Sequence, residues 1–143
     1  KMTMTEKYKI LTQYIKDISS ETSDVETYLF VQDNISKYHL SIDITSKPLK
    51  NRLIEINTTL KFEDKSGNEK KSHFELIYAT VISIDNELKE KNDLQKIILC
   101  DVQVLVYPKI EKALLNLIHS SGFPKVKFEK KIDFERLYNE KFN

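Results

Sequence analysis

Between residues 37 and 84, apolar and polar side chains alternate with a period of two in three successive runs. Alternation of this kind, rich in β-branched and aromatic residues, predicts half-buried β-strands. Ser46-Lys47-Pro48 separates the first run from the second, and the turn sequence 64–68 separates the second from the third. Because both connections are short, we expect the three strands to be antiparallel neighbours in a meander.

A weaker alternation predicts a fourth strand over residues 13–21, with Tyr14 and Ile18 opposed to Asp17 and Glu21. The stretch between this strand and the first of the three runs contains several aromatic and aliphatic residues. We interpret it as a loop, and a connection of about 15 residues is uncommon in a small domain and is often functional.

After Ile84 the apolar spacing changes to that of a helix. It predicts one long helix over residues 94–118, which Pro108 kinks or restarts and Gly122 follows as the C′ residue. The run 97–106 could instead form a buried strand. Asp133 is placed to cap a short last helix. Strands followed by helices predict an α+β fold, in which both helices pack on one face of a four-stranded antiparallel sheet.

The composition bounds the class of protein. A length of 143 residues suits a single domain spanning residues 1–143. Lys and Arg number 23 against 22 Asp and Glu, and this balance argues against a general nucleic-acid binder. No apolar run is long enough to cross a bilayer, and nothing at the start of the sequence is typical of a signal peptide.

Small counts exclude several chemistries. Two glycines cannot form a glycine-rich phosphate loop, and one cysteine, Cys100, can form neither an intrachain disulfide nor a thiolate zinc site. The three histidines lack metal-ligand spacing, and no serine lies in a nucleophile elbow. We therefore expect a protein that is not an enzyme and that uses no cofactor or metal. The low cysteine usage fits the cytoplasm.

The predicted long helix is apolar on more than one side, because Val104, Val106 and Leu115 lie off its main stripe. A helix that is apolar nearly all round must be covered on two sides. We expect one side to meet the sheet of the same chain and the other to meet another subunit.

Several local strings occur in a characteristic order between Tyr8 and Phe142. They are Tyr14-Ile15-Lys16-Asp17-Ile18-Ser19, Phe74-Glu75-Leu76, Tyr107-Pro108, Gly122-Phe123-Pro124, and Asp133-Phe134 leading to Leu137-Tyr138. Together with the order of elements, they resemble the SecB-type protein-export chaperones. The resemblance implies a cytosolic homotetramer, a dimer of dimers, without catalytic activity. Such a chaperone binds unfolded precursor proteins without ATP and delivers them to the SecA motor ATPase for export.

The sequence also departs from the family pattern. Asn34-Ile35-Ser36 stands where an aromatic-proline pair is usual, His73 stands where a leucine is common, and no long acidic tail follows the last helix. These differences favour an alternative, a SecB-like chaperone dedicated to one client such as an antitoxin, without an export role. A second alternative is an unrelated α+β enzyme or ligand-binding domain, which a deep closed pocket would favour.

The outward positions of the predicted strands collect five carboxylates against one basic residue, Lys61. The carboxylates are Asp17, Glu21, Asp43, Glu55 and Glu75. An acidic face steers a basic partner toward it. The resemblance implies that Asp17, Glu21 and Glu75 dock the SecA motor. The alternative is an ordinary solvated sheet face.

Aromatic residues form a second candidate site. Tyr28 and Phe30 lie in the predicted loop, and Phe128, Phe134 and Tyr138 lie near the end of the chain. An aromatic groove can bind many unfolded segments, because stacking and area burial do not demand one side-chain pattern. The resemblance places a client groove between that loop, the sheet and the last helix. The alternative for each of these residues is a place in the core.

Overall fold

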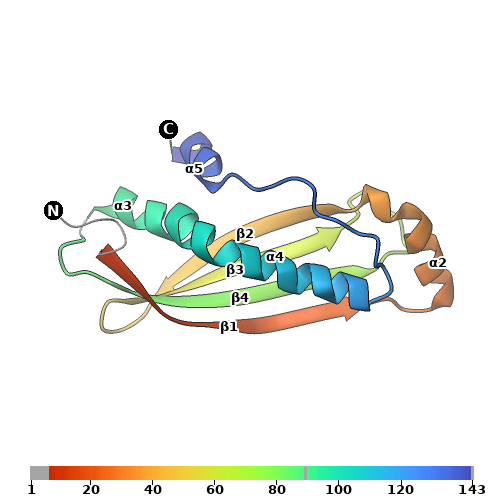
Figure 1. The fold of residues 1–143 in the computed structure, drawn as a ribbon, viewed down its shortest axis with the longest axis horizontal. Coiled ribbons are helices and arrows are strands. Elements are labelled where there is room, and N and C mark those ends of the chain that lie inside the picture. The colour runs from red at the N-terminus through yellow and green to blue at the C-terminus, as the bar shows by residue number, and fades with distance from the viewer. Residues whose placement is uncertain (1–6, 89, 143) are drawn as a thin grey trace.

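The computed structural model describes residues 7–88 and 90–142, and its centre is a four-stranded antiparallel sheet (Figure 1). The strands are β1 (Tyr8–Glu21), β2 (His39–Pro48), β3 (Leu53–Glu63) and β4 (His73–Ile84). Their order in the sheet is β1-β4-β3-β2, so the predicted meander of β2, β3 and β4 is confirmed. The first strand begins at Tyr8, earlier than the predicted start at Gln13.

Strand β1 pairs with β4 in a register that shifts at two bulges, between Ile10 and Thr12 and between Ile15 and Asp17. Each bulge inserts an unpaired residue, so the side chains beyond it change face relative to a regular strand. Tyr14 consequently lies on the same face of the sheet as Asp17, whereas strict alternation placed it with Ile18. The predicted faces of Asp17 and Ile18 are as expected.

The connection between β1 and β2 is not a loop. It contains helix α2 (Val25–Asn34) and a 3-10 turn (Ile35–Lys37). The Asp24 carboxylate caps α2 by accepting a hydrogen bond from the Thr27 N–H at 2.8 Å. The prediction of a loop was wrong because the contiguous apolar residues 28–31 obscure the helical spacing of Tyr28, Val31 and Ile35, which all face the core. The capping Asp24 was also present in the sequence.

The second half of the chain forms one long helical rod on the inner face of the sheet (Figure 1). It consists of α3 (Lys91–Lys96), a π-helical turn (Ile97–Asp101) and α4 (Val102–Ser120). Helix α4 continues through Pro108, and the irregular turn lies before that residue. The run 97–106 is therefore helical, and its interpretation as a strand is wrong.

Two predicted helix boundaries are confirmed. Gly122 has a φ of +105° after α4, where its N–H bonds to the His119 carbonyl and the Phe123 N–H bonds to the Ile118 carbonyl, each at 3.2 Å. The Asp133 carboxylate caps α5 (Phe134–Phe142) by accepting a hydrogen bond from the Arg136 N–H at 3.0 Å.

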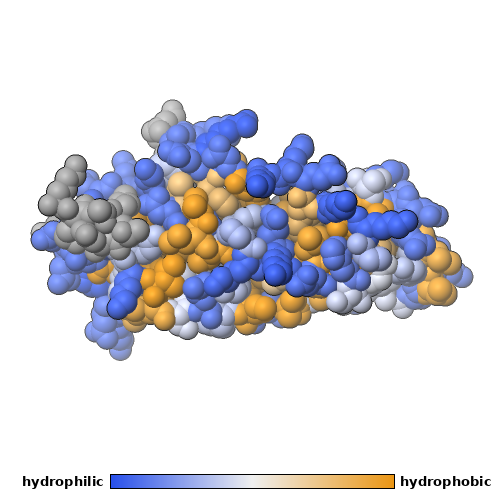
Figure 2. Space-filling model, viewed as in Figure 1, coloured by the Kyte–Doolittle hydropathy of each residue, from blue (hydrophilic) through white to orange (hydrophobic). Residues whose placement is uncertain are grey.

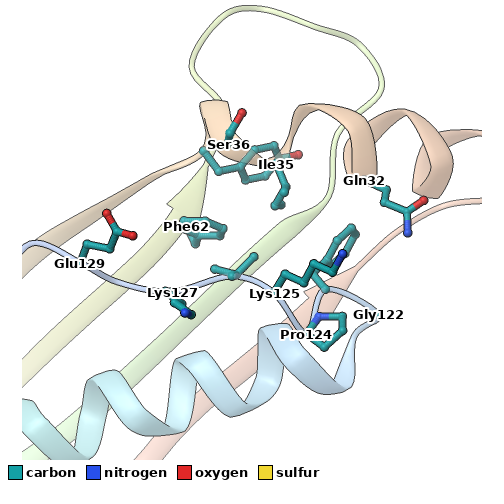
Figure 3. Close-up of a pocket in the computed structure, with 12 residues that line it drawn as sticks. Gln32, Ile35, Ser36, Phe62, Gly122, Pro124, Lys125, Lys127 and Glu129 are labelled. Atoms are coloured by element: carbon teal, nitrogen blue, oxygen red, sulfur yellow. The ribbon is translucent and has the colours of Figure 1, made fainter.

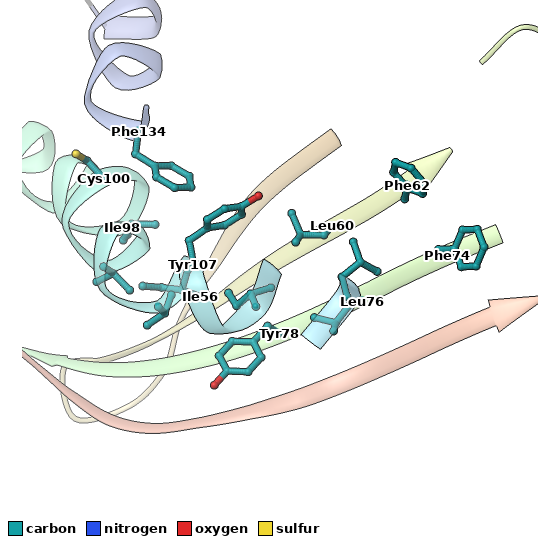
Figure 4. Packing of buried hydrophobic residues seen from close by; sticks show 14 of the residues in the cluster. Ile56, Leu60, Phe62, Phe74, Leu76, Tyr78, Ile98, Cys100, Tyr107 and Phe134 are labelled. Carbon is teal, nitrogen blue, oxygen red and sulfur yellow. The ribbon is translucent and has the colours of Figure 1, made fainter. Parts of the chain in front are cut away.

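The core lies between the inner face of the sheet and α4 (Figure 4). Its largest buried side chains come from alternate positions of β3 and β4 and from one stripe of α4. They include Ile56, Leu60, Leu76, Ile82, Ile110, Leu114 and Ile118. The predicted period of two along β3 and β4 is therefore the pattern that fills the core.

One polar pair lies inside this core. Gln103 on α4 and Thr58 on β3 are both fully buried, and the Thr58 hydroxyl oxygen lies 3.0 Å from the Gln103 Nε2 and 3.2 Å from its Oε1. A buried amide and hydroxyl that bond each other satisfy polar groups that would otherwise be costly to bury. The pair therefore fixes the position of α4 over β3.

We expect Gln103→Ala to lower the free energy of unfolding by about 2–4 kcal/mol, because it leaves the Thr58 hydroxyl unpaired and opens a cavity. The double variant Thr58→Val/Gln103→Leu should regain most of that loss, because it replaces both polar partners by apolar groups. Urea unfolding of the wild type, the Gln103→Ala variant and the double variant measures both effects. A double variant that is no more stable than Gln103→Ala would show that the pair is not coupled in this way.

Candidate groove, sheet face and apolar surface

Residues 123–133, which we call the strap, connect the end of α4 to α5 along the β2 side of the inner face (Figure 1). A cavity of about 610 Å³ lies between the strap and α2, and one of about 710 Å³ lies between the strap, β2 and α5. Both cavities are open to solvent and meet at shared lining residues, and Figure 3 shows the cavity next to α2. We treat the two together as one open groove. We call it the strap groove. Its shared lining residues are Ser36, Tyr38, Phe62, Lys127 and Glu129.

The floor of the strap groove is a cluster of aromatic rings. The Phe62 ring lies 5.4 Å from that of Tyr38, 5.5 Å from that of Phe128 and 6.2 Å from that of Phe74, measured between centroids. The Tyr38 hydroxyl oxygen accepts a hydrogen bond from the Ser72 N–H at 2.9 Å, and burial raises the pKa of Tyr38. The floor is therefore apolar, with its one phenol group kept neutral at physiological pH.

The strap is held in place at its first residues. The Tyr28 hydroxyl donates to the Gly122 carbonyl at 2.6 Å, and the Tyr28 ring packs 5.1 Å from the Phe123 ring. Further along, His119 Nε2 lies 2.8 Å from the Val126 carbonyl oxygen. Phe123 and Val126 are buried, whereas the lysines between and beyond them are exposed. The strap thus presents apolar side chains to the protein and charged side chains to the rim of the groove.

The five aromatic residues proposed from sequence lie in different places. Phe128 lines the groove, and Tyr28 anchors the strap without lining either cavity. Phe30 is half-buried on α2, outside both cavity linings. Phe134 is buried and packs 5.1 Å from Tyr107 (Figure 4), and the Tyr138 hydroxyl donates to the Asn92 carbonyl at 3.1 Å.

Sequence reasoning missed the residues of β2 and β3 that line the groove, above all Tyr38, Leu40 and Phe62. They lie on the inward face of their strands. The alternation predicts that an inward residue is buried, but it does not predict which element packs over it. The exposed Leu137 of α5 also lines the groove. The available signal was that β2 and β3 carry inward apolar residues that the single long helix could not all cover.

On the outer face of the sheet, the structure brings the three predicted carboxylates together. Asp17 pairs with Ile77 and Glu21 pairs with His73, while Ser19, between them on β1, pairs with Glu75. All three side chains therefore point from the same face of two neighbouring strands.

This face is not as acidic as alternation indicated. Lys61 lies 3.7 Å from Glu75, and the β1 bulge turns Lys16 toward Glu55, whose carboxylate oxygen lies 2.5 Å from the Lys16 Nζ. The hydrogen bond from Lys16 lowers the pKa of Glu55. The expectation of a single basic residue is wrong, because a bulge moved Lys16 onto the outer face.

Large apolar side chains remain exposed on β1 and on the first turn of α4 (Figure 2). We call this the β1–α4 surface, and it consists of Leu11, Ile15, Ile18, Val104 and Leu105, each between 43% and 58% exposed, whereas the exposed Tyr14 lies on the outer face of the sheet. Of the residues expected off the main helix stripe, Val104 is exposed, Leu115 is half-buried and Val106 is buried within the chain. Exposed apolar surfaces of this kind are typical of interaction sites.

Across residues 7–88 and 90–142, no cluster of three His, Cys, Asp or Glu side chains could hold a metal ion. None of the helices in that part of the chain is long and apolar enough to cross a membrane. An α+β fold with an open aromatic groove and an exposed apolar surface is typical of proteins that bind other polypeptides.

Comparisons with known proteins agree with this class. The family model described as preprotein translocase subunit SecB matches residues 1–143, and the chain belongs to the SecB family. It is 52% identical over 140 residues to a relative from Pelagibacter ubique that carries the name of the SecB protein-export protein, covering 98% of this chain and 100% of that one. It is 27% identical over 131 residues to the protein-export protein SecB of a Bradyrhizobium species, covering 92% of this chain and 79% of that one.

A solved structure shares the fold. It is a SecB-like chaperone of Mycobacterium tuberculosis in complex with a ChAD peptide from the HigA1 antitoxin, with a TM-score of 0.64 and 8% identity, covering 90% of this chain and 93% of that one. The α+β fold predicted from the sequence is therefore confirmed. The chain is a SecB-type chaperone, and its family is one of chaperones rather than enzymes.

Proposed function

We propose that this chain is an ATP-independent holdase that binds unfolded precursor proteins in the strap groove and delivers them to the SecA motor in the cytoplasm. The observation that carries the proposal is the open groove with an aromatic floor, formed by Tyr38, Phe62 and Phe128. Such a floor takes apolar side chains of many shapes, and many weak contacts along one extended segment add up to useful affinity.

The test of the holding activity is the refolding of a denatured secretory precursor, followed without nucleotide. The protein should slow refolding, and Leu137→Asp in the groove should remove much of that effect, because it places a charge where an apolar side chain of the client would bind. Leu49→Asp is the matched control, since Leu49 is 38% exposed and Leu137 is 46% exposed but only Leu137 lines the groove. Refolding at the unassisted rate with the wild-type protein would refute the proposal.

Delivery to SecA is proposed through Asp17, Glu21 and Glu75 on the outer face of the sheet. Replacing all three by Ala should weaken binding to the cognate SecA about tenfold, chiefly through a slower on-rate, while the holding of precursors stays unchanged. Asp43→Ala, on β2 of the same face, is the control. Surface plasmon resonance at two salt concentrations measures the effect. If the triple variant binds SecA as tightly as the wild type, these three carboxylates do not form the SecA-binding site.

We also propose a homotetramer, built as a dimer of dimers. The β1–α4 surface supports this, because its exposed Leu, Ile and Val side chains lie on the edge strand β1 and on α4. Copies of the same chain that cover this surface would remove its apolar area from water, which is the dominant favourable term in association.

A SecB-like chaperone dedicated to one client, such as an antitoxin, is the second candidate. Two observations favour it: the mixed charge of the outer face, where Lys61 pairs with Glu75, and the exposed His73 beside Glu21. The Mycobacterium tuberculosis relative with the same fold was solved with an antitoxin peptide. The SecA binding experiment separates the two candidates, since a dedicated chaperone would not bind the motor.

A further inference from the structure

Four lysines follow the rim of the strap groove. Lys125 lines the cavity next to α2, Lys130 and Lys131 line the cavity next to α5, and Lys127 lines both. All four side chains are exposed, and none of them forms an ion pair within the described part of the chain. Their charges are therefore available to whatever lies in the groove.

The acidic side chains near the same rim are mostly engaged elsewhere. The Asp133 carboxylate caps α5 through the Arg136 N–H at 3.0 Å, and Glu140 pairs with Arg136 Nε at 2.9 Å. Glu129 is the one carboxylate of the strap that no described side chain or backbone group engages. The backbone N–H leaves the negative charge of Asp133 in place, so the rim carries four lysines without an ion pair among the described residues against two such carboxylates, Asp133 and Glu129, and its excess charge is positive.

We propose that the strap groove selects extended segments in which apolar or aromatic residues are flanked by Asp or Glu. The inference rests on the holdase function proposed above, and names the chemistry of its clients. The aromatic floor would take the apolar side chains, while the lysines of the rim reach the flanking carboxylates. A segment flanked by Lys or Arg brings like charges to the same rim, and like charges in apposition oppose binding.

The expected size of the effect follows from the exposure of these lysines. Each exposed ion pair contributes little, but two or three together amount to about a tenfold difference in affinity between acidic and basic flanks. The difference should appear mainly in the association rate, and it should shrink as salt rises, because exposed charges are screened within about 10 Å at 0.1 M ionic strength.

The experiment uses the full-length protein and three labelled peptides with one aromatic and apolar central sequence, flanked by Glu, by Gln or by Lys. Fluorescence anisotropy at low and high salt gives the three affinities. We expect the Glu-flanked peptide to bind about tenfold more tightly than the Lys-flanked one, with the Gln-flanked peptide between them. The quadruple variant Lys125→Glu/Lys127→Glu/Lys130→Glu/Lys131→Glu should reverse this order.

A variant with the same change in net charge serves as control. It replaces the exposed Lys47, Lys50, Lys65 and Lys91, none of which lines the strap groove, by Glu. This control should keep the preference for acidic flanks.

The outcomes distinguish this inference from the function on which it rests. The charge selection is refuted if all three peptides bind and the Glu-flanked and Lys-flanked peptides bind equally. It is also refuted if the Lys-flanked peptide binds best. In both cases the groove remains a client-binding site. If none of the peptides binds, the proposed holding function fails together with the charge selection. A reversal of preference in the control variant would show that net charge, and not the strap, decides the selection.

Discussion

Replacing Ile15 by Asp should break the assembled protein into smaller species. Ile15 lies on the edge strand β1, opposite Tyr78 of β4, and is 45% exposed within one chain. If copies of the chain cover the β1–α4 surface, the new carboxylate would be buried without a partner, which costs several kcal/mol. Light scattering after gel filtration should give a mass near four chains for the wild type, and near one or two chains for Ile15→Asp.

Val25→Asp is the control for this experiment. Val25 is 68% exposed on α2, outside the β1–α4 surface, so its replacement should leave the mass near four chains. Circular dichroism should confirm that both variants are folded. A wild-type protein that elutes as a monomer, or an Ile15→Asp variant that keeps the wild-type mass, would contradict the assignment of this surface to subunit contacts.

Replacing Gly122 by Ala should destabilise the protein and loosen the strap. Gly122 has a φ of +105°, and a Cβ at this position would lie 2.7 Å from Cε1 of the Tyr28 ring. The backbone conformation alone costs a side chain about 1–3 kcal/mol, and displacing Tyr28 would also weaken its hydrogen bond to the Gly122 carbonyl. We expect a total loss of about 2–4 kcal/mol in the free energy of unfolding, measured by urea denaturation.

Gly67 provides the comparison for this second prediction. Its φ is +86°, but an added Cβ would meet no atom within 4 Å, so Gly67→Ala tests the backbone cost without the steric contact. Gly122→Ala should therefore cost clearly more than Gly67→Ala. It should also weaken the binding of peptides in the strap groove, which Gly67→Ala should not. Equal effects of the two substitutions would show that the contact between Tyr28 and Gly122 does not hold the strap.

The sequence predicted those parts of the fold that rest on local chemistry. Three such features act within a few residues of the chain: the alternation in β2, β3 and β4, the glycine after α4 and the aspartate before α5. They can therefore be recognised in a single sequence. The start of the edge strand β1 and the faces of its residues were harder to predict from the sequence. Its two bulges depend on pairing with β4, which is distant along the chain.

The site was less predictable than the fold. An aromatic residue on the inward face of a strand has the same sequence pattern whether a helix or an open groove covers it, so Tyr38 and Phe62 could not be told from core. Lys16 reaches Glu55 across β4 only because of a bulge. The strap lysines alternate with buried strap residues such as Val126, and only the folded strap shows that they share one rim.

Site-directed photo-crosslinking tests most directly whether unfolded segments bind in the strap groove. Ser36→Cys places one thiol where the two cavities meet, and Ser46→Cys places one on the distant part of β2, since both serines are exposed. Burial raises the pKa of the Cys100 thiol, so a crosslinker should label the introduced cysteine selectively. With a denatured precursor, we predict strong crosslinking from position 36 and little from position 46. Crosslinking that is equal at both positions, or stronger at position 46, would contradict the account.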